Sequence, residues 1–468
     1  MTELKEHQKR IVSEMQDPRT TGKLLIHSTG SGKSLTAIAT ASGLGANSTV
    51  VVPASLRGNF SKEVLKHKAN PAQFDVKSYE AFAKDPTPST GHNDLLILDE
   101  AHKLKNSDTR RTVQALENAS LYKKKLLLTA TPLVNSPSDI APLINIVSNN
   151  PRQLPESPEA FNKQFTERRQ DHPGWIRRNL FGAHAYDITV PKNMAMFRNR
   201  AKPFVDFYDN PKDSKDFPSV SEYTVKVPLT KDQENLYNYV YKELPGSAKS
   251  AIENNLPASR KDTTVLNRFL NSTRQISNTT RNFGMNSELA SSPKIDMIVE
   301  RIKSAKRPSV VYSNYLDSGV YPLSHQLAKA NIAHEVFTGK MNDKQKADVV
   351  KRYNSGKLKA LIISSSGGEG LDLKGTGALH LLENHWNSSK IEQIKGRVAR
   401  YQSHSALAPS ERNVAIYKYL STMPAHSPSL LEKLHITKPA ARLTADEYLE
   451  NMSATKKKLN DQFITALR

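Results

Sequence analysis

Two short clusters of polar residues near the N-terminus have the types and the spacing needed to handle a nucleoside triphosphate. The first is a glycine-rich segment at residues 27–34, HSTGSGKS. Backbone N–H groups of such a turn, at the start of a helix, can bind phosphate oxygens. The second is Asp99-Glu100-Ala101-His102, whose carboxylates suit a metal ion and an attacking water. Together the clusters predict that the chain binds and hydrolyses a nucleoside triphosphate.

The residues of these clusters have separate predicted roles. Lys33 reaches the terminal phosphates, and the Ser34 hydroxyl together with Asp99 holds Mg²⁺. Glu100 orients or activates the attacking water. A chance turn is the competing interpretation of the glycine-rich segment alone, and the acidic cluster argues against it. The remaining contacts to the nucleotide are expected from Thr29, Gly30, Ser31 and Gly32.

A third cluster lies far along the chain, at residues 393–400, QIKGRVAR. Arg397 and Arg400 are one helical turn apart, so we expect them to share a helix face. A guanidinium is planar and always charged, and such arginines contribute about 10³–10⁵ in rate when they stabilise a transferred phosphoryl group. Gln393 and Gly396 beside them favour this role over an ordinary surface helix. We therefore expect Gln393, Arg397 and Arg400 to act at the γ-phosphate.

Four short apolar runs must position the first two clusters. They lie at residues 23–27, 49–53, 94–98 and 125–129, and they are continuously apolar rather than alternating. That pattern is typical of parallel strands buried on both faces. Helical stretches fit between them, so the fold class is α/β, a doubly wound parallel sheet. The clusters follow strands, where open parallel sheets bind ligands.

Composition limits the class of partner. The chain has 468 residues and a net charge of +21, from 67 basic and 46 acidic side chains. Such a field attracts polyanions, so nucleic acid is the expected partner, although a solvated basic surface is the alternative. The absence of cysteine excludes disulfides and thiolate metal sites. No apolar run approaches the roughly 18 residues of a membrane span, and residues 1–6 do not resemble a signal peptide. We expect a soluble intracellular protein with no membrane partner.

The order of segments resembles superfamily-two helicases, and among them the Swi/Snf-type ATPases. The resemblance is carried by an upstream Gln8 and by the segments VVPASL (51–56), DEAHKLKN (99–106) and LLLTATPLVN (126–135). It implies that the nucleotide is ATP and that Gln8 contacts the adenine. His27 and Ala130 depart from the usual residues, and the DEMGLGKT form of the phosphate loop is absent. None of these departures removes a group that touches phosphate or metal.

The second half of the chain resembles the compact ATPases of large DNA viruses, the poxvirus-type nucleoside triphosphatase I and its relatives. The segments are GGEGLDL (367–373), Trp386-Asn387 and GRVARYQSH (396–404). The resemblance runs from residue 4 to about residue 420. It implies two RecA-like lobes, with Gly370 and Asp372 also at the nucleotide. It further implies nucleic-acid contacts at Pro53, Ser55, Arg57, Thr129, Thr131, Ser364 and Trp386.

The expected domains are a first lobe at 1–150, a helical and basic insertion with a linker at 151–216, a second lobe at 217–440 and a C-terminal helix at 441–468. Residues 161–169 predict a short helix. Between 175 and 203, six basic residues and one acid are interleaved with aromatics. This pattern suits a nucleic-acid groove, or equally a core with a basic rim.

Helices are expected in two further places. A helical insertion is expected near 230–287, with a basic amphipathic helix at 263–287. The C-terminal helix begins with a capping box, TADE at 444–447, and carries an apolar stripe. We expect that stripe to pack on the second lobe, with a helix that docks a protein partner as the alternative.

The most direct functional interpretation is a nucleic-acid-dependent ATPase, a translocase or helicase of the Swi/Snf type that moves along double-stranded DNA as a monomer. One alternative is a strand-unwinding or branch-migration helicase of repair and recombination. Another is an ATP-controlled subunit of a nucleoprotein assembly. If the source is viral, the host cytoplasm or the virion is the expected location.

Overall fold

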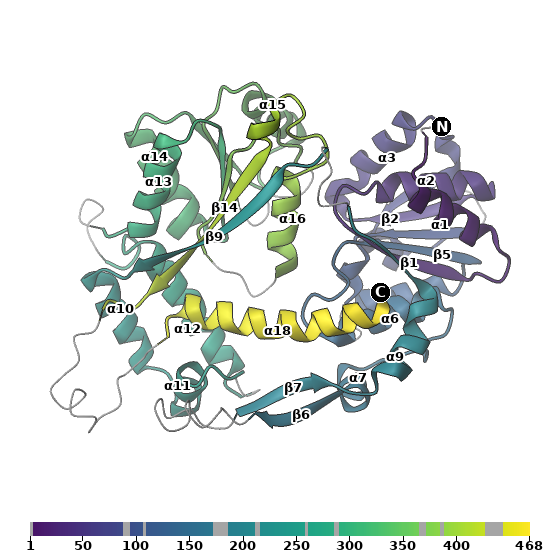
Figure 1. Cartoon of the computed structure of the whole chain (residues 1–468), viewed down its shortest axis with the longest axis horizontal. Coiled ribbons are helices and arrows are strands. Elements are labelled where there is room, and N and C mark those ends of the chain that lie inside the picture. The colour runs from purple at the N-terminus through teal and green to yellow at the C-terminus, as the bar shows by residue number, and fades with distance from the viewer. Residues whose placement is uncertain are drawn as a thin grey trace. The chain divides into compact units, whose positions relative to one another are not determined.

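The structure is a computed structural model, and it describes residues 3–87, 94–105, 109–171, 186–210, 216–257, 261–284, 290–364, 371–383, 388–425 and 443–468. The chain divides into two compact units. The first unit comprises Met1–Pro211 and Thr455–Arg468, and the second comprises Lys212–Ala454. Each unit contains a six-stranded parallel sheet with helices on both faces (Figure 1). The predicted α/β class is confirmed.

The sheet of the first unit has the strand order β3-β2-β4-β5-β1-β8. All of its strand pairs are parallel. The inner strands are short runs of Leu, Ile and Val that are buried on both faces, as the sequence predicted. The strands are β1 (Gly22–His27), β2 (Ser48–Val52), β3 (Phe74–Ser78), β4 (Leu95–Asp99), β5 (Lys124–Thr129) and β8 (Val205–Tyr208).

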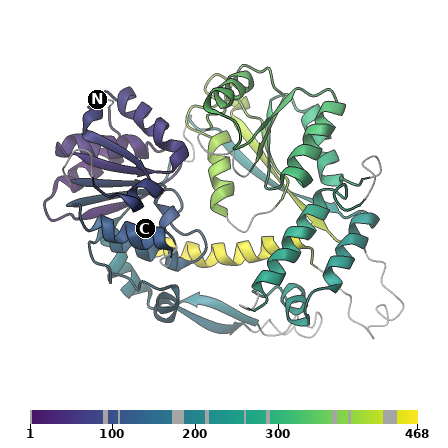
Figure 2. The same cartoon turned by 180° about the vertical axis from the view of Figure 1, so that it is seen from behind.

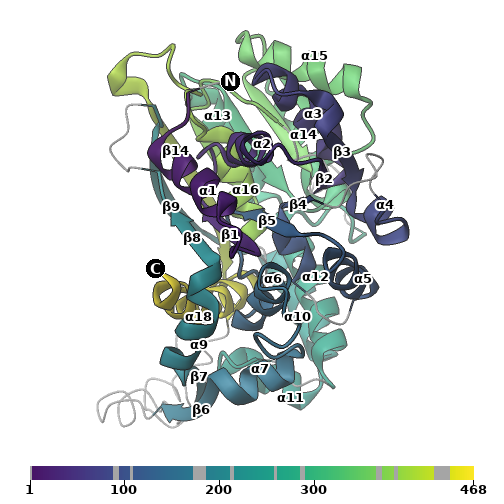
Figure 3. The same cartoon turned by 90° about the vertical axis from the view of Figure 1, so that its right-hand side faces the viewer.

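Two hydrophobic layers cover this sheet. Because successive side chains of a strand point to opposite faces, Leu25 packs in one layer and Leu24 and Ile26 in the other. The first layer is completed by α1 (Glu6–Gln16), α2 (Lys33–Leu44) and α3 (Arg57–Lys66). The second is completed by α4 (Tyr79–Lys84), α5 (Arg110–Ala119) and α6 (Ala141–Val147). Figure 3 shows α1, α2 and α3 together on their side of the sheet.

The segment after the first lobe differs from the expectation in two ways. The helix predicted at 161–169 is α7 (Pro158–Phe165), and β6 (Thr166–Asp171) follows it directly. The helix ends because β6 pairs antiparallel with β7 (Tyr186–Pro191). After α9 (Met194–Ala201), β8 returns to pair with β1. The predicted insertion and linker therefore includes a strand of the first sheet.

The sheet of the second unit has the order β11-β12-β10-β13-β14-β9, again with parallel pairs throughout. One face packs against α13 (Pro293–Ser304) and α14 (Tyr321–Lys329), and the other packs against α15 (Asp343–Asn354) and α16 (Ser388–Val398). The strands are β9 (Ser219–Pro228), β10 (Ser309–Ser313), β11 (His334–Phe337), β12 (Ala360–Ser364), β13 (Ala378–Leu381) and β14 (Asn413–Thr422).

Three helices of the second unit lie outside this sheet. They are α10 (Lys231–Lys242), α11 (Gly246–Glu253) and α12 (Thr263–Asn278), which can be followed in Figure 2. Leu266, Phe269 and Leu270 are buried in a cluster with Tyr237, so the apolar stripe predicted at 263–287 forms a core. The helix itself ends at Asn278, earlier than expected.

The C-terminal helix α18 (Ala445–Leu467) begins with the predicted capping box. Thr444 N donates to Glu447 Oε2 at 2.9 Å, and Glu447 N donates to Thr444 Oγ1 at 3.2 Å. Tyr448 belongs to a buried cluster of the second unit, as expected. Phe463, however, packs on Phe161 and Phe197 of the first unit, which corrects the prediction that the whole stripe packs on the second lobe. None of the helices in the described segments is long and apolar enough to span a membrane.

Candidate ATP-hydrolysis site

The glycine-rich segment forms a loop between β1, which ends at His27, and α2, which begins at Lys33. Gly30 and Gly32 have φ angles of 80° and 84°, in the left-handed region that glycine adopts without strain. A Cβ at Gly32 would also lie 2.6 Å from Gln8 Nε2, so a side chain there would displace the Gln8 amide. The predicted phosphate loop therefore has the expected strand–turn–helix context.

Polar groups of this loop are arranged for a phosphate. Lys33 Nζ donates to the carbonyl oxygens of His27 and Ser28, at 2.8 and 3.1 Å, so its charge lies at the loop itself. Within the described residues, the buried Ser31 hydroxyl has no hydrogen-bond partner. Asn210 Nδ2 donates to Thr29 O at 2.8 Å and fixes the far side of the loop. These donors fit a nucleotide phosphate, with Ser34 at the first turn of α2 where a Mg²⁺ ligand is expected.

Gln8 packs against this loop. Its Oε1 accepts from Lys5 N at 2.9 Å, and its Nε2 donates to Gly32 O at 3.3 Å. The structure thus brings the predicted adenine-reading residue to the phosphate loop. The neighbouring His7 ring stacks on Tyr208, with centroids 3.5 Å apart, and its Nε2 lies 3.2 Å from Ser31 O. Burial lowers the pKa of His7, so the neutral ring donates to that carbonyl.

Sequence reasoning missed the stacked pair of His7 and Tyr208. His7 could have been considered for the site because it adjoins Gln8 in the sequence. Tyr208 could not, because only the pairing of β8 with β1 brings it to the loop.

His27 stands where many phosphate loops carry Gly or Ala, and its side chain contacts Asp206 of β8. Its Nε2 lies 2.7 Å from Asp206 Oδ1, and its side chain is fully buried. Arg10 donates to Asp206 Oδ2 at 2.7 Å through Nη2. The larger side chain is therefore accommodated by a carboxylate that β8 supplies, which explains why the departure is compatible with the loop.

The acidic cluster lies at the end of β4. Asp99 is the last residue of the strand, and its Oδ1 accepts from Glu100 N at 2.9 Å. Glu100 has a φ angle of 53°, a conformation that costs a non-glycine residue free energy and that clusters at functional sites. Glu100 Oε2 lies 3.3 Å from His102 Nδ1, which in turn lies 3.2 Å from Thr129 Oγ1. The two carboxylates thus lie at the carboxyl edge of the sheet, where β2 and β5 are the neighbours of β4.

The loop that follows β5 is fixed by a residue that sequence reasoning missed, Asp139. Its Oδ2 accepts from the N–H groups of Val134 and Asn135, at 2.9 and 2.6 Å. Burial raises the pKa of Asp139 above its ordinary value, although these N–H groups oppose the shift. Ser136 and Asp139 form a capping box, and the S-x-x-D spacing was a readable signal.

The arginine segment lies in the second unit. Ile391, Ile394 and Val398 of α16 are buried against the sheet, and Arg397 lies in the last turn of the helix. Arg400 lies beyond the helix end, so the expectation that both arginines share a helix face is wrong. The physical reason is that Arg400 N donates to Ser403 Oγ, at 3.1 Å, instead of to a helical carbonyl. The Arg400 side chain reaches Asp372, with Nη1 3.5 Å from Oδ1.

The residues predicted to contact nucleic acid lie in different environments. Ser55 and Arg57 are exposed at the start of α3, whereas Pro53 before them is buried. Thr129 and Ser364 are buried at the ends of β5 and β12. Thr131 is half-buried, and its N–H donates to Thr129 Oγ1 at 3.1 Å. Gly370 and Trp386 lie outside the described residues.

Comparison with known proteins identifies the family. Residues 46–282 match the SNF2-related domain, and residues 293–402 match the helicase conserved C-terminal domain. The chain belongs to the SNF2-related family. It is an ATP hydrolase of this helicase and ATPase family, and the two sheets are its RecA-like lobes.

Relatives of this SNF2-related ATPase occur in large DNA viruses. A protein of Acanthamoeba polyphaga mimivirus, named as an ATP-dependent RNA helicase, is 31% identical over 98% of this chain and 95% of its own length. A second mimivirus protein with the same kind of name is 24% identical over 91% of this chain and 84% of its own length. A termination factor NPH-I homolog of African swine fever virus is 23% identical over 99% of this chain and 79% of its own length.

Proposed function

We propose that this SNF2-related ATPase couples ATP hydrolysis to movement along double-stranded DNA. The observation that carries the proposal is that residues with phosphate chemistry occur in both compact units. Lys33, Asp99 and Glu100 belong to the first unit, and Arg397 and Arg400 belong to the second. If both sets act on one nucleotide, hydrolysis requires the lobes to close and product release lets them open.

The proposed mechanism assigns one step to each residue. Lys33 binds the β- and γ-phosphates, and Glu100 takes the proton of the attacking water. Ser34 and Asp99 would hold Mg²⁺, which would supply positive charge to the phosphate oxygens. Arg397 and Arg400 stabilise the charge that spreads over the γ-phosphoryl oxygens in the transition state. Gln393 lies on the same helix as Arg397, and we assign it to the residues that act at the γ-phosphate.

Duplex DNA is the proposed track. The net charge of +21 favours a polyanion, and the motifs resemble Swi/Snf-type enzymes. Exposed Ser55 and Arg57 at the start of α3 suit contacts to a phosphate backbone. The mimivirus relatives are named for RNA, so an RNA-stimulated helicase is the second candidate. Viral relatives also support a viral origin, with the host cytoplasm or virion as the location.

The test is the ATPase rate at saturating duplex DNA, single-stranded DNA and RNA of equal length. We expect duplex DNA to raise kcat several-fold, with RNA much less effective. Greater stimulation by RNA supports the second candidate. A rate that is indifferent to all three nucleic acids contradicts the proposal and favours an ATP-controlled assembly subunit.

A further inference from the structure

Arg400 lies in a turn that is stabilised by two buried residues, Ser403 and His404. Ser403 and His404 are only 5% and 2% exposed, although both are polar. Arg400 N donates to Ser403 Oγ at 3.1 Å, and Ser403 N donates to Arg400 O, also at 3.1 Å. The turn is thus closed on both sides of the arginine by one serine. Buried polar groups are normally hydrogen-bonded, and these two side chains follow that rule.

His404 fixes that serine to the sheet. Its Nε2 lies 2.8 Å from Thr376 O, and its Nδ1 lies 2.8 Å from Ser403 Oγ. A carbonyl only accepts, so Nε2 carries the proton and Nδ1 of the neutral ring is an acceptor. The Ser403 hydroxyl proton therefore has two acceptors at 2.8 Å, His404 Nδ1 and Arg400 O. Burial lowers the pKa of His404 and keeps the ring neutral. The hydrogen bonds therefore run from Arg400 through Ser403 and His404 to Thr376.

Thr376 belongs to the same loop as Asp372, the residue that Arg400 contacts. A second bond ties this loop to the turn, because Gly375 N donates to Ser403 O at 2.9 Å. Thr376 is itself fully buried, and its hydroxyl lies 2.8 Å from Tyr353 OH in the core. The backbone that carries the Arg400 side chain is therefore hydrogen-bonded at two points to the loop that contains Thr376.

We propose that Ser403 and His404 are positioning residues that hold Arg400 in the geometry needed for hydrolysis. They touch no substrate in this proposal and act only through Arg400. The proposal rests on the proposed function, because it assumes that Arg400 acts in catalysis. It goes further by assigning a role to the two residues that end the GRVARYQSH segment.

The test is a double-mutant cycle on the full chain with duplex DNA present. Ser403→Ala removes the central oxygen. His404→Gln keeps a donor for Thr376 O but has no atom at the position of Nδ1, which lies 2.8 Å from Ser403 Oγ. We expect each to lower kcat roughly 10-fold with the KM for ATP changed little, since the interaction matters in the transition state. In an Arg400→Ala background, neither change should lower kcat further, because both act through the same side chain.

The matched control is Ser405→Ala, two residues along the same turn. Ser405 is exposed and its Oγ donates to Gln402 O, at 3.0 Å, so kcat should be unchanged. A general structural role for Ser403 would instead lower kcat by the same factor with or without Arg400, and that result overturns the proposal. Wild-type kcat in Ser403→Ala also overturns it. If His404→Gln fails to fold, Ser403→Ala carries the test alone.

The Arg400→Ala arm separates this proposal from the proposed function. If that change lowers kcat but Ser403→Ala does not, only the positioning role fails. If Arg400→Ala leaves kcat unchanged, the catalytic assignment of Arg400 fails and the positioning role fails with it.

Discussion

The side chains of Glu100 and His102 are paired, with Oε2 of the carboxylate 3.3 Å from Nδ1 of the ring. The same ring nitrogen lies 3.2 Å from Thr129 Oγ1 at the end of β5. One histidine thus connects the carboxylate proposed to handle the water with the strand end that leads into the LLLTATPLVN loop. In the proposed mechanism, this contact would join the nucleotide site to the segment that the family resemblance associates with DNA.

The first prediction concerns Glu100. The change Glu100→Gln keeps the shape of the side chain but removes the carboxylate, so we expect ATP to bind while turnover falls by roughly 10²-fold or more. Binding can be measured with a fluorescent ATP analogue and turnover by phosphate release. Lys33→Ala, in comparison, should weaken binding as well. Near-normal turnover in Glu100→Gln would show that another group handles the water.

The second prediction concerns Arg397 in the last turn of α16. Arg397→Ala should lower kcat and leave nucleotide binding nearly unchanged, because the proposed contact forms with the transition state. Arg397→Lys should restore little, because an ammonium lacks the planar fork of a guanidinium. The measurement is steady-state ATPase with the folded fraction determined separately. If only thermal stability falls, and turnover per folded molecule is unchanged, Arg397 is structural.

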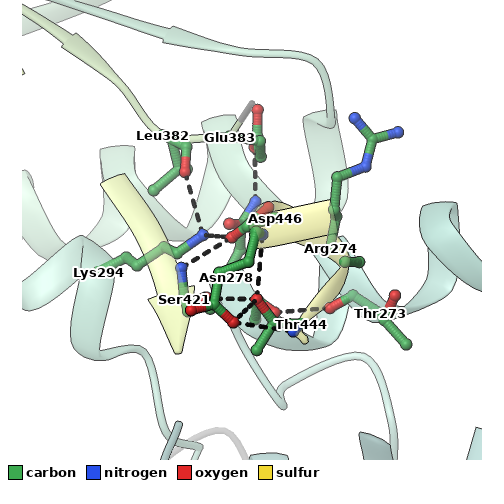
Figure 4. A network of polar contacts seen from close by, with 12 residues as sticks. Thr273, Arg274, Asn278, Lys294, Leu382, Glu383, Ser421, Thr444 and Asp446 are labelled. Carbon is green, nitrogen blue, oxygen red and sulfur yellow. Dashed lines mark hydrogen bonds and ion pairs between the residues drawn. The ribbon is translucent and has the colours of Figure 1, made fainter. Parts of the chain in front are cut away.

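The third prediction concerns the buried ion pair that anchors the start of α18 (Figure 4). Lys294 Nζ lies 2.5 Å from Asp446 Oδ2, and neither side chain is exposed. The same oxygen accepts from Ser421 N at 2.9 Å. Lys294→Met leaves a buried carboxylate without its cation, so we expect a loss of about 3–5 kcal/mol in the free energy of unfolding. Urea denaturation of the full chain measures it.

The control for this pair is the exposed one between Lys231 and Glu234. Because solvent screens such pairs, Lys231→Met should cost less than about 1 kcal/mol. The double change Lys294→Met with Asp446→Leu should recover most of the lost stability, since an apolar pair needs no desolvation of charge. Equal losses from Lys294→Met and Lys231→Met would contradict the importance of the buried pair.

The fourth prediction concerns pH and His380, which is 1% exposed in the core of the second unit. Burial, with a smaller effect of Arg301, lowers the pKa of His380 to about 3. Between that value and the ordinary value of about 6.5, the unfolded chain binds a proton that the folded chain does not. The stability from this residue is therefore full above about pH 6.5 and is lost as the pH falls.

His380→Asn removes this titration and keeps a polar atom near the position of Nδ1, which lies 2.9 Å from Tyr419 OH. Urea unfolding from pH 6.5 toward pH 3 should show a slope smaller by up to about 1.4 kcal/mol per pH unit in the variant. An unchanged slope would mean that the ring becomes protonated in the folded protein.

The local structure of the candidate ATP site could be predicted from the sequence, because its proposed residues are neighbours in the chain. The loop before Lys33 and the pair Asp99 and Glu100 each follow a buried strand, and a local pattern is enough to place them. What the sequence did not reveal comes from long-range pairing. Tyr208 and Asp206 reach the phosphate loop only because β8, a short half-buried strand, pairs with β1.

The arginine segment illustrates a second limit. The spacing of Arg397 and Arg400 predicted one continuous helix, but a side-chain acceptor, Ser403 Oγ, replaces the helical carbonyl and ends the helix early. Helical periodicity carries no information about such competition from a serine. Similarly, the apolar stripe of α18 predicted a packed helix but could not indicate that Phe463 packs in the first unit.

The most direct test of the central claim is the displacement of a triplex-forming third strand from duplex DNA. A motor that tracks along the duplex should remove the third strand with ATP, and it should fail with a non-hydrolysable analogue or with the Glu100→Gln variant. Binding alone is not informative, because a chain of +21 binds DNA at low salt whatever its function. Displacement without hydrolysis, or none despite DNA-stimulated ATPase activity, would contradict translocation.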